Sequence, residues 1–530
     1  MRRKLVTSAL PYIHGIPHLG NIVGSVLPAD IYTRFCRLRG EKVVYICGSD
    51  AHGTMFEVTA RKENTTPEKL VYKNHKKVKE IFDKFNLSFD YYGLTHSQEN
   101  KKLTYHIFEK LDERGYIKEK DVENAYCDNC KMFLADRFIE GTCPHCKGLA
   151  RGDQCDDCGK LLDTKEIIEA YCVICKNKIE FQKTKHLFLN LPKLESWLKE
   201  FVGESEGWSK IAKSETLGFL KQGLKERAIT RDSKWGFKVP KNGYEGKVFY
   251  VWFDAPIGYI SFTKRWCSKN NEKFEDWWKS DEVELIQFMA KDNIIFHSII
   301  FPAMLKGCNE NWKLVDKLIA CGWLKTKGVK FSKSRGKGLT TEEALEKYPT
   351  SYWRYILTAL YPEDTDSIFS VEFFKEKINN ELADIIGNFI HRVLSFSYSN
   401  FGGIPKIDKE KPAELKEIDK IFEKITENFE NCRFREALKN IVHYAKISNA
   451  YFNNNEPWHK TKEEKKEVCF FSGNLVKNLA ILLHPIIPSF SEKVFGFLNL
   501  DKNKLKWEDA KKFNFSGKIN KSKPLVKKIG

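Results

Sequence analysis

The chain lacks any apolar run long enough to cross a membrane. Its most apolar late stretch, residues 479–487, is too short for a transmembrane helix and is interrupted by proline. The first residues, Met1-Arg2-Arg3-Lys4, lead directly into a short strand pattern, so we expect no secretory signal segment. These two absences predict a cytoplasmic protein with no membrane partner, whose thiols stay reduced.

Acidic side chains are scarce relative to basic ones. The 530 residues include 71 acidic and 89 basic side chains, a net charge of +18. Such an excess attracts a polyanionic partner, but a lysine-rich solvated surface gives the same count, so charge alone favours neither. A hydrophobic content of 42% is typical of a globular chain, and the length allows several domains.

The first 50 residues have the pattern of a strand, a crossover helix and a second strand. Residues 4–9 and 43–48 are short apolar segments, and a helical pattern between them runs from about residue 18 to Gly40. This order predicts a parallel sheet that binds its ligand at the carboxyl ends of the strands. Asp50 follows the second strand at that edge. We therefore expect an α/β protein with a doubly wound parallel sheet of the Rossmann type.

The later sequence changes character several times. Strand patterns resume at 248–252 and 284–289, residues 321–345 favour a loop, and 371–484 predict a bundle of four or five helices. The predicted regions are 1–116, the first half of the α/β domain; 117–230, a cysteine-rich insertion; 231–320, the second half; 321–370, a lysine-loop region; 371–500, the helical bundle; and 501–530, a basic, partly ordered tail.

Two short motifs point to phosphate chemistry. Residues 11–21 place histidine and glycine at a strand-to-helix turn, where backbone N–H groups bind anions. Residues 328–336 carry two lysines and two serines that could fold over a triphosphate and neutralise a pyrophosphate leaving group. Taken alone, the first motif is more often structural and the second more often a solvated basic loop.

Together the two motifs resemble those shared by class I aminoacyl-tRNA synthetases, in the right order. Asn21 departs from the pattern, because many class I enzymes have a second histidine there. Residues 7–12, 48–54, 251–259 and 291–298 resemble methionyl-tRNA synthetases, and the likeness extends from residue 4 to about 490. It implies ATP-dependent activation of L-methionine and its transfer to the 3′ end of tRNA(Met), initiator tRNA included.

The resemblance also assigns site residues. It implies catalysis by His18, Asn21, Lys330 and Lys333. It implies binding of ATP, with transient Mg²⁺, by His18, Gly20, Asn21, Asp292, Lys330, Ser332, Lys333 and Ser334. It implies methionine binding by Ala9, Leu10, Tyr12, Asp50, Trp252, Ala255, Pro256, Tyr259, Asn293, Phe296 and His297. The set of Asn293, Phe296, His297 and Phe301, together with Phe331 in the 330–334 motif, looks closer to the archaeal and eukaryotic branch than to the common bacterial one.

The chemistry of methionine agrees with these assignments. Its side chain is unbranched, apolar and polarizable, so aromatic walls can select it by shape and by contacts between sulfur and rings. Asp50 would hold the substrate ammonium in a charge-assisted pair. A single aromatic residue is more often core than pocket, but placement at the ends of parallel strands favours a pocket.

Eight of the 15 cysteines form four C-x-x-C pairs within 49 residues, which predicts two structural zinc ions. The ligands would be Cys127, Cys130, Cys143, Cys146, Cys155, Cys158, Cys172 and Cys175. A disulfide framework does not suit the expected compartment, and a redox motif would not recur four times. The family resemblance favours one site from the two middle pairs and another from the two outer pairs, while sequential pairing is the alternative. The other seven cysteines are expected in the core.

The helical region carries a further resemblance. Asn388, Arg392 and Trp458 resemble residues with which the family reads the anticodon, where an exposed tryptophan stacks on an unpaired base. The alternative for Trp458 is a place in the bundle core. We expect a monomer.

Two rival functions are weaker. A zinc-ribbon RNA-binding protein with an inactive nucleotide fold does not explain the intact 330–334 motif or Asp50. Class I synthetases for valine, isoleucine and leucine normally carry a much larger editing insertion, and a cysteine enzyme remains a rival.

Overall fold

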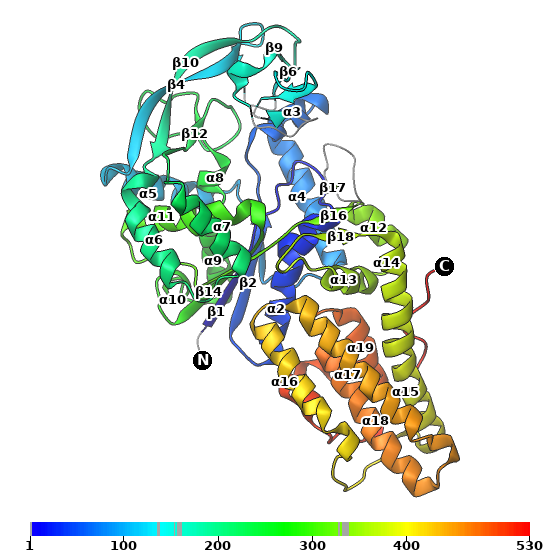
Figure 1. The fold of residues 1–530 in the computed structure, drawn as a ribbon. Coiled ribbons are helices and arrows are strands. Elements are labelled where there is room, and N and C mark those ends of the chain that lie inside the picture. Colours follow the sequence, from blue (N-terminus) through cyan, green and yellow to red (C-terminus); the bar gives the residue numbers. More distant parts are fainter. Residues whose placement is uncertain (1–2, 135–137, 153, 156–161, 327–328, 331–338) are drawn as a thin grey trace.

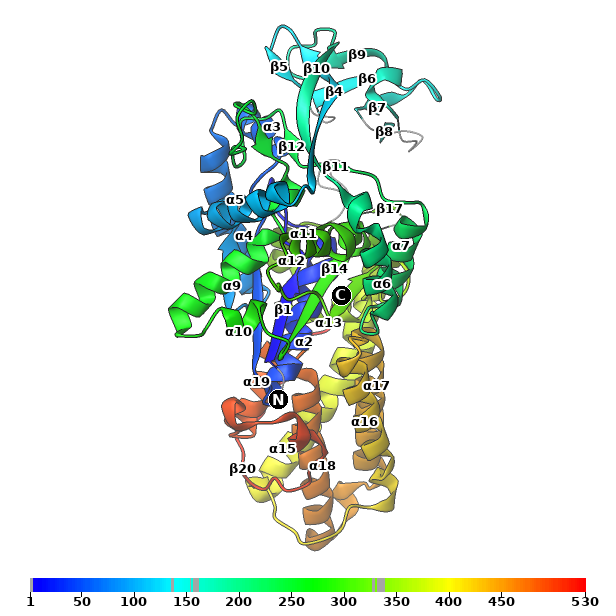
Figure 2. The same ribbon diagram turned by 90° about the vertical axis from the view of Figure 1, so that its left-hand side faces the viewer.

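The computed structural model describes residues 3–134, 138–152, 154–155, 162–326, 329–330 and 339–530. Its two halves are an α/β region and a helical bundle, and the cysteine-rich insertion projects from the far end of the α/β region (Figure 1; Figure 2). Among the described residues, no helix is both long enough and apolar enough to span a membrane.

A five-stranded parallel sheet with strand order β15-β14-β1-β2-β3 forms the centre of the α/β region. The strands are β1 (Arg3–Ser8), β2 (Val43–Ser49), β3 (Tyr91–Leu94), β14 (Val283–Ala290) and β15 (Lys317–Cys321). The chain leaves β1 toward β2 on one side, and β14 pairs with β1 on the other, so the strand order reverses at β1. This confirms the predicted doubly wound sheet and places the binding crevice at the carboxyl end of β1.

The crossover from β1 to β2 is one continuous helical rod. It consists of α1 (Leu19–Asn21), the π-helical turn η1 (Ile22–Val26) and α2 (Leu27–Leu38). The rod begins beside the binding crevice and ends at Leu38, and the φ of +74° at Gly40 suits glycine in the turn that leads to β2.

Helices cover both faces of the sheet because successive strand residues point to opposite sides (Figure 1). Val6 and Tyr45 belong to one core, whereas Leu5 and Val44 belong to the other. The first core includes α2, α4 (Pro67–Lys84) and α13 (Thr350–Ala359). The second includes α5 (Gln98–Glu113), α6 (Glu195–Glu204), α7 (Lys210–Lys221), α9 (Ile257–Asn270) and α11 (Phe301–Cys308).

The insertion is built on a long antiparallel pair, β4 (Ile117–Cys127) and β10 (Glu180–Leu189). Beyond this pair lie β5 (Met132–Phe133) and a small sheet of β6 (Ile139–Thr142), β7 (Leu149–Arg151), β8 (Gln154–Cys155) and β9 (Ile168–Cys172). The cores here are small and include cysteine side chains.

The helical bundle forms the other end of the molecule. Its helices are α14 (Val371–Glu376), the π-helical η7 (Lys377–Gly387), α15 (Asn388–Phe401), α16 (Glu417–Glu430), α17 (Phe434–Asn454), α18 (Lys462–Leu483) and α19 (Pro488–Phe497). Every residue from Val468 to Leu483 is buried, including the polar Asn474 and Lys477, so α18 is the central helix.

The bundle is not separated from the sheet, because one hydrophobic core runs through both. The ring of Phe35 on α2 stacks on Phe429 of α16 with ring centroids 5.1 Å apart, and it meets the edge of Trp507 at 4.8 Å. Residues 501–530, for which the sequence predicts a partly ordered tail, pack along both halves. Trp507 is fully buried, and the backbone N–H of Lys527 donates to the Tyr352 hydroxyl at 2.8 Å.

Two expected elements are wrong. The strand expected at 248–252 is limited to β13 (Val248–Phe249), which pairs antiparallel with β12 (Thr230–Arg231) outside the parallel sheet. The chain then turns at Tyr250 into the short helix α8 (Val251–Asp254). The loop expected at 321–345 contains β16 (Leu324–Thr326), β17 (Val329–Lys330) and α12 (Thr341–Lys347), a helix capped by the Thr340 side chain.

Candidate active site

A cavity of about 640 Å³ opens at the carboxyl ends of β1, β2 and β14. The loop after β1, the start of the helical rod, the residues after β2 and β14, and α8 all contribute to its wall. The predicted site residues that line it are Ala9, Leu10, Tyr12, His18, Gly20, Asn21, Asp50, Trp252, Asp292 and Asn293. The cavity therefore brings residues assigned to ATP and residues assigned to methionine into one space.

His18 and Asn21 fix each other at the start of the helical rod. The His18 ring nitrogen Nδ1 accepts a hydrogen bond from the Asn21 backbone N–H at 3.2 Å, and Asn21 Oδ1 accepts from the His18 backbone N–H at 3.1 Å. Because Nδ1 is an acceptor, the neutral ring carries its hydrogen on Nε2. Asn21 therefore holds the helix start where many class I synthetases have a second histidine, and the helix N-terminus favours an anion.

Asp50 is a buried carboxylate in the cavity wall. Its side chain is only 5% exposed, and no described residue offers a hydrogen-bond partner to its Oδ1 atom. Burial, with a smaller contribution from the nearby Asp254 charge, raises the pKa of Asp50 well above its ordinary value. A cation placed beside Oδ1 would give this oxygen a partner and favour the ionised carboxylate.

A buried polar chain lies behind Asp50. His52 Nδ1 is 2.6 Å from Asp254 Oδ2, and His52 Nε2 is 2.9 Å from His96 Nδ1. Burial raises the pKa of Asp254, which His52 partly offsets, and burial with the adjacent His52 lowers the pKa of His96 to about 4. These contacts tie the segment after β2 to α8. The sequence analysis did not find them, because the partners lie far apart in the chain.

The aromatic residues assigned to methionine form two layers. Trp252 lines the cavity, and Phe296 stacks on its far side with centroids 3.5 Å apart and rings 5° from parallel. Tyr259 and His297 are deeply buried, and the Tyr259 hydroxyl is 2.9 Å from His297 Nε2. Ala255, Pro256, Tyr259, Phe296 and His297 do not line the cavity itself.

The ring of His297 is oriented from both sides. His297 Nδ1 lies 2.9 Å from the Asn293 carbonyl oxygen, which can only accept, so Nδ1 carries the hydrogen. Nε2 then accepts from the Tyr259 hydroxyl. Burial lowers the pKa of His297 to about 4, which keeps the ring neutral at neutral pH.

Several lining residues carry no sequence signal that would have found them. Trp235 donates from Nε1 to the Ala51 carbonyl oxygen at 2.7 Å. The Arg231 guanidinium lies 3.8 Å from the centre of the Tyr250 ring, and the Lys291 ammonium lies 4.0 Å from that of Trp323. Arg231 and Trp235 follow the insertion in the sequence, and only the closed fold returns them to the cavity.

One acidic side chain, Asp366, fixes the chain just before the lysine-containing motif at residues 328–336. Asp366 pairs with Lys291 at 2.7 Å and with Lys325 at 2.8 Å, and it accepts from the Trp323 backbone N–H at 2.9 Å. Lys325 pairs in register with Lys330 across β16 and β17. Ser332, Lys333 and Ser334 lie outside the described residues, and only the backbone of Lys330 is described.

Comparison with known proteins identifies the family. Residues 4–394 match the family model "tRNA synthetases class I (M)", and residues 414–527 match the model of an anticodon-binding domain of tRNA ligase. The methionine–tRNA ligase of Borreliella burgdorferi is 42% identical over 537 residues, which span 100% of this chain and 71% of that protein. The chain belongs to the class I methionyl-tRNA synthetases.

Other relatives come from different branches of life. Methionine–tRNA ligase 1 of Acaryochloris marina is 43% identical over 94% of this chain and 91% of its own length. The methionine–tRNA ligase of Korarchaeum cryptofilum is 39% identical over 99% and 96%. A crystal structure of Mycobacterium tuberculosis methionyl-tRNA synthetase bound by methionyl-adenylate matches with a TM-score of 0.82 at 20% identity, covering 99% of this chain and 100% of that one. This last match supports the fold.

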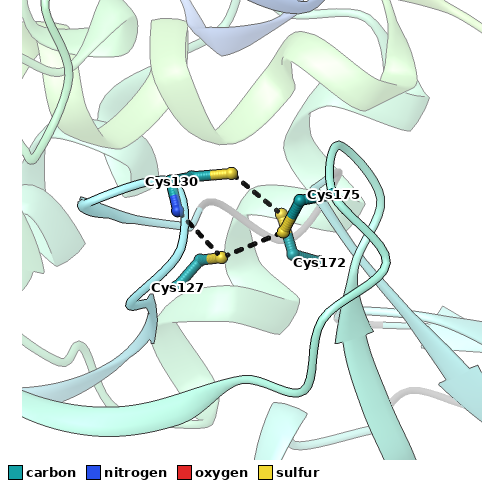
Figure 3. A group of neighbouring side chains, drawn as sticks. All are labelled: Cys127, Cys130, Cys172 and Cys175. Carbon is teal, nitrogen blue, oxygen red and sulfur yellow. Dashed lines mark hydrogen bonds between the residues drawn. The ribbon is translucent and has the colours of Figure 1, made fainter.

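The cysteine pairs of this synthetase gather in two clusters. The sulfur atoms of Cys127, Cys130, Cys172 and Cys175 all lie within 4.8 Å of one another (Figure 3). Cys127 and Cys175 are 3.4 Å apart, and Cys130 and Cys172 are 3.9 Å apart. Sulfurs around a tetrahedral zinc ion with bonds of about 2.3 Å are roughly 3.8 Å apart, so this cluster has the dimensions of a zinc site.

The second cluster contains Cys143, Cys146 and Cys155, and Cys158 lies outside the described residues. The two outer C-x-x-C pairs, 127/130 and 172/175, therefore form one cluster. The described members of the two middle pairs, Cys143, Cys146 and Cys155, form the other. Sequential pairing would need Cys127 and Cys130 to meet Cys143 and Cys146, and the structure does not bring these together.

The residues assigned to the anticodon lie on the bundle. Asn388 and Arg392 are one turn apart on α15, and Trp458 lies in the short 3-10 turn Pro457–His459 between α17 and α18. The Arg392 guanidinium is 5.5 Å from the centre of the Phe452 ring, and the Trp458 ring meets the same Phe452 at 6.3 Å. Trp458 is 43% exposed and is therefore not a core residue.

Proposed function

We propose that this synthetase joins ATP and L-methionine as methionyl-adenylate in the cavity beside β1, and then transfers the methionyl group to the 3′ end of tRNA(Met), initiator tRNA included. The observation that carries the proposal is that one cavity contains both the buried Asp50 carboxylate and a helix N-terminus marked by His18. The Oδ1 atom of Asp50 has no hydrogen-bond partner among the residues that the structure describes. The carboxylate suits an ammonium ion and the helix N-terminus suits a phosphate.

The phosphate end of the cavity would bind ATP with its Mg²⁺. His18 would donate from Nε2, and Asn21 would keep that ring in place through its own contact with the His18 backbone. Lys330 and Lys333, with Ser332 and Ser334, would neutralise charge on the departing pyrophosphate, while Gly20 and Asp292 would position the nucleotide. In-line attack by the methionine carboxylate then needs positioning and electrostatic stabilisation, without a covalent enzyme intermediate.

The other end would bind methionine. Asp50 would accept from the substrate ammonium, with Ala9, Leu10, Tyr12 and Trp252 around the chain. Behind this wall, Phe296 supports Trp252, and the neutral His297 and Tyr259 form a fixed hydrogen-bonded pair beside Ala255 and Pro256. A thioether side chain suits an aromatic wall of this kind.

We infer that the cysteine clusters hold two structural zinc ions. The sulfur spacing and the four-thiolate set of Cys127, Cys130, Cys172 and Cys175 support the first, and Cys143, Cys146, Cys155 and Cys158 would hold the second. Bound zinc would supply folding free energy to this small insertion, and the cysteines would hold strands β4 to β10 together through it.

Asn388, Arg392 and Trp458 would read the anticodon. The exposure of Trp458 and the shared contact of Arg392 and Trp458 with Phe452 support this assignment. A cytoplasmic, monomeric enzyme with archaeal and eukaryotic features is part of the proposal. A Dictyostelium discoideum relative named as cytoplasmic, 42% identical over 100% of this chain, supports the compartment. The branch is not confirmed, because bacterial relatives are 42% and 43% identical and an archaeal relative is 39% identical.

The test is charging of tRNA with radiolabelled methionine. We expect methionine to be attached to a tRNA with the anticodon CAU, and charging to drop sharply when that anticodon is changed. Charging that ignores the anticodon, or that favours another amino acid, would refute the proposal.

A further inference from the structure

A single buried arginine joins the α/β region to the helical bundle. Helix α13 lies between the sheet and the bundle (Figure 1). Arg354 is on this helix, and its side chain is fully buried. The guanidinium donates to the carbonyl oxygens of Ile486 at 2.6 Å and Pro485 at 3.0 Å, which lie in the turn between α18 and α19 of the bundle.

The same guanidinium also holds the α/β region. It donates to Asp30 Oδ2 on α2 at 2.7 Å, and to the carbonyl oxygens of Phe85 and Asn86, just after α4, at 3.2 Å each. Arg354 thus contacts acceptors in three separate parts of the molecule besides its own helix. The planar guanidinium carries several N–H donors that point in different directions, which the single ammonium group of lysine cannot reproduce.

The charges around this contact favour the ionised pair. Burial would raise the pKa of Asp30, but the Arg34 and Arg354 guanidinium groups and the Ser88 hydroxyl hold it well below its usual value. Burial lowers the pKa of Arg354 to about 10, so it stays charged at neutral pH. Burial and the Arg34 charge lower the pKa of His484, in the turn between α18 and α19, to about 4 and keep it neutral, so it adds no positive charge beside the two arginines.

Asp30 connects this joint to the reaction site. It lies on the helical rod that begins beside His18 and Asn21 and continues without a break to Leu38. The start of the rod therefore lines the cavity, while Asp30, near the middle of the rod, is bonded through Arg354 to the bundle that carries Trp458.

We propose that Arg354 is a positioning residue for tRNA charging, which fixes the bundle relative to the cavity so that a tRNA bound by its anticodon presents its 3′ end to the adenylate. The inference rests on the proposed function. Arg354 touches neither the cavity nor the anticodon residues, so it acts through the geometry between them. An error of about an ångström in placing a reacting group lowers a rate by up to roughly a hundredfold.

The test uses the full chain and the variant Arg354→Lys, which keeps the charge opposite Asp30 but cannot reach all five acceptors. Three properties are measured: methionine-dependent pyrophosphate exchange, affinity for an RNA hairpin that copies the anticodon arm, and the kcat for charging full tRNA. We expect exchange and hairpin affinity within twofold of the unaltered protein, and a charging kcat at least tenfold lower.

Arg433→Lys is the matched control. Arg433 also joins the two halves, through Glu363 at 3.2 Å and Asp364 at 2.8 Å, but its side chain is 40% exposed. Arg433 and Asp364 are 40% and 43% exposed, and lysine can keep a positive charge beside Glu363, which is only 7% exposed. This variant should therefore keep all three properties.

Unchanged charging in Arg354→Lys would overturn the inference, and so would a parallel loss of exchange or hairpin affinity in a folded variant, which indicates general destabilisation. If Arg354→Lys does not fold, Asp30→Asn is measured in the same three assays. It removes the carboxylate charge that Arg354 and Arg34 share but leaves the contacts of Arg354 with the carbonyl oxygens. It should lower the charging kcat at least threefold with exchange intact, and unchanged charging would overturn the inference. If the unaltered protein fails to charge tRNA with methionine, the proposed function itself is wrong.

Discussion

Replacing Asp50 with asparagine tests the proposed ammonium site most sharply. The substitution keeps the size of the side chain but removes the only charge that Asp50 can offer to the substrate. Removing one partner of a buried, hydrogen-bonded charge pair costs about 2–5 kcal/mol, because the other charge is left buried and unpaired. At about 1.4 kcal/mol per factor of ten, the methionine KM should rise roughly 30-fold to several thousand-fold.

The pH dependence gives a second readout of the same change. Burial raises the pKa of Asp50 in the free protein, and an ammonium ion binds the ionised form. Methionine affinity should therefore increase as pH rises through that elevated pKa, and the Asp50→Asn variant should lose this increase. Pyrophosphate exchange with varied methionine, measured across pH, records both effects.

Whereas Asp50→Asn should weaken methionine binding, it should not lower the stability of the folded protein. A carboxyl group whose pKa is raised on folding contributes full stability below its unfolded pKa and loses it as pH rises through the folded pKa. At neutral pH, Asp50→Asn should therefore be at least as resistant to thermal unfolding as the unaltered protein. The control is Asp419→Asn, the same substitution at a half-exposed position on α16 outside the cavity, and it should leave the methionine KM unchanged. A methionine KM unchanged by Asp50→Asn would refute the ammonium site.

Three further changes test other parts of the site. Lys333→Ala should lower the rate of adenylate formation by roughly a hundredfold or more with little change in methionine binding, and a near-normal rate would exclude the phosphate role. Metal analysis should find close to two zinc ions per chain, and Cys127→Ser should lower the zinc content and the thermal stability more than the exchange rate, whereas zinc-free purified protein would contradict the zinc sites. Trp458→Ala should leave exchange intact and lower charging of tRNA with the CAU anticodon by roughly five- to two-hundredfold, since one lost base stack costs about 1–3 kcal/mol; an equal loss with a changed anticodon would indicate general destabilisation.

The sequence predicted those features that depend on local patterns. The strand, helix and strand at residues 3–49 repeat apolar side chains at periods that define each element, and the sheet followed from their order. The cysteine pairs could be predicted as metal ligands because the two members of each pair are only three residues apart in the sequence. Asp50 was found because it directly follows a strand that the pattern had placed.

The rest depends on contacts between distant segments. Phe296 supports Trp252 from 44 residues away, and His52 meets Asp254 across 202 residues, so no window of sequence contains either pair. The β-branched and aromatic residues at 248–252 favour a strand, but the pairing of β13 with β12 ends at Phe249 and the chain enters α8 at Val251, so tertiary contacts overrode the local pattern.

The central claim is that the cavity activates methionine. The direct measurement is ATP–pyrophosphate exchange without tRNA, carried out with each of the twenty amino acids separately. We predict exchange with methionine far above that with any other amino acid, and its loss in Lys333→Ala. Exchange with none of the twenty, or a preference for valine, isoleucine, leucine or cysteine, would contradict the account.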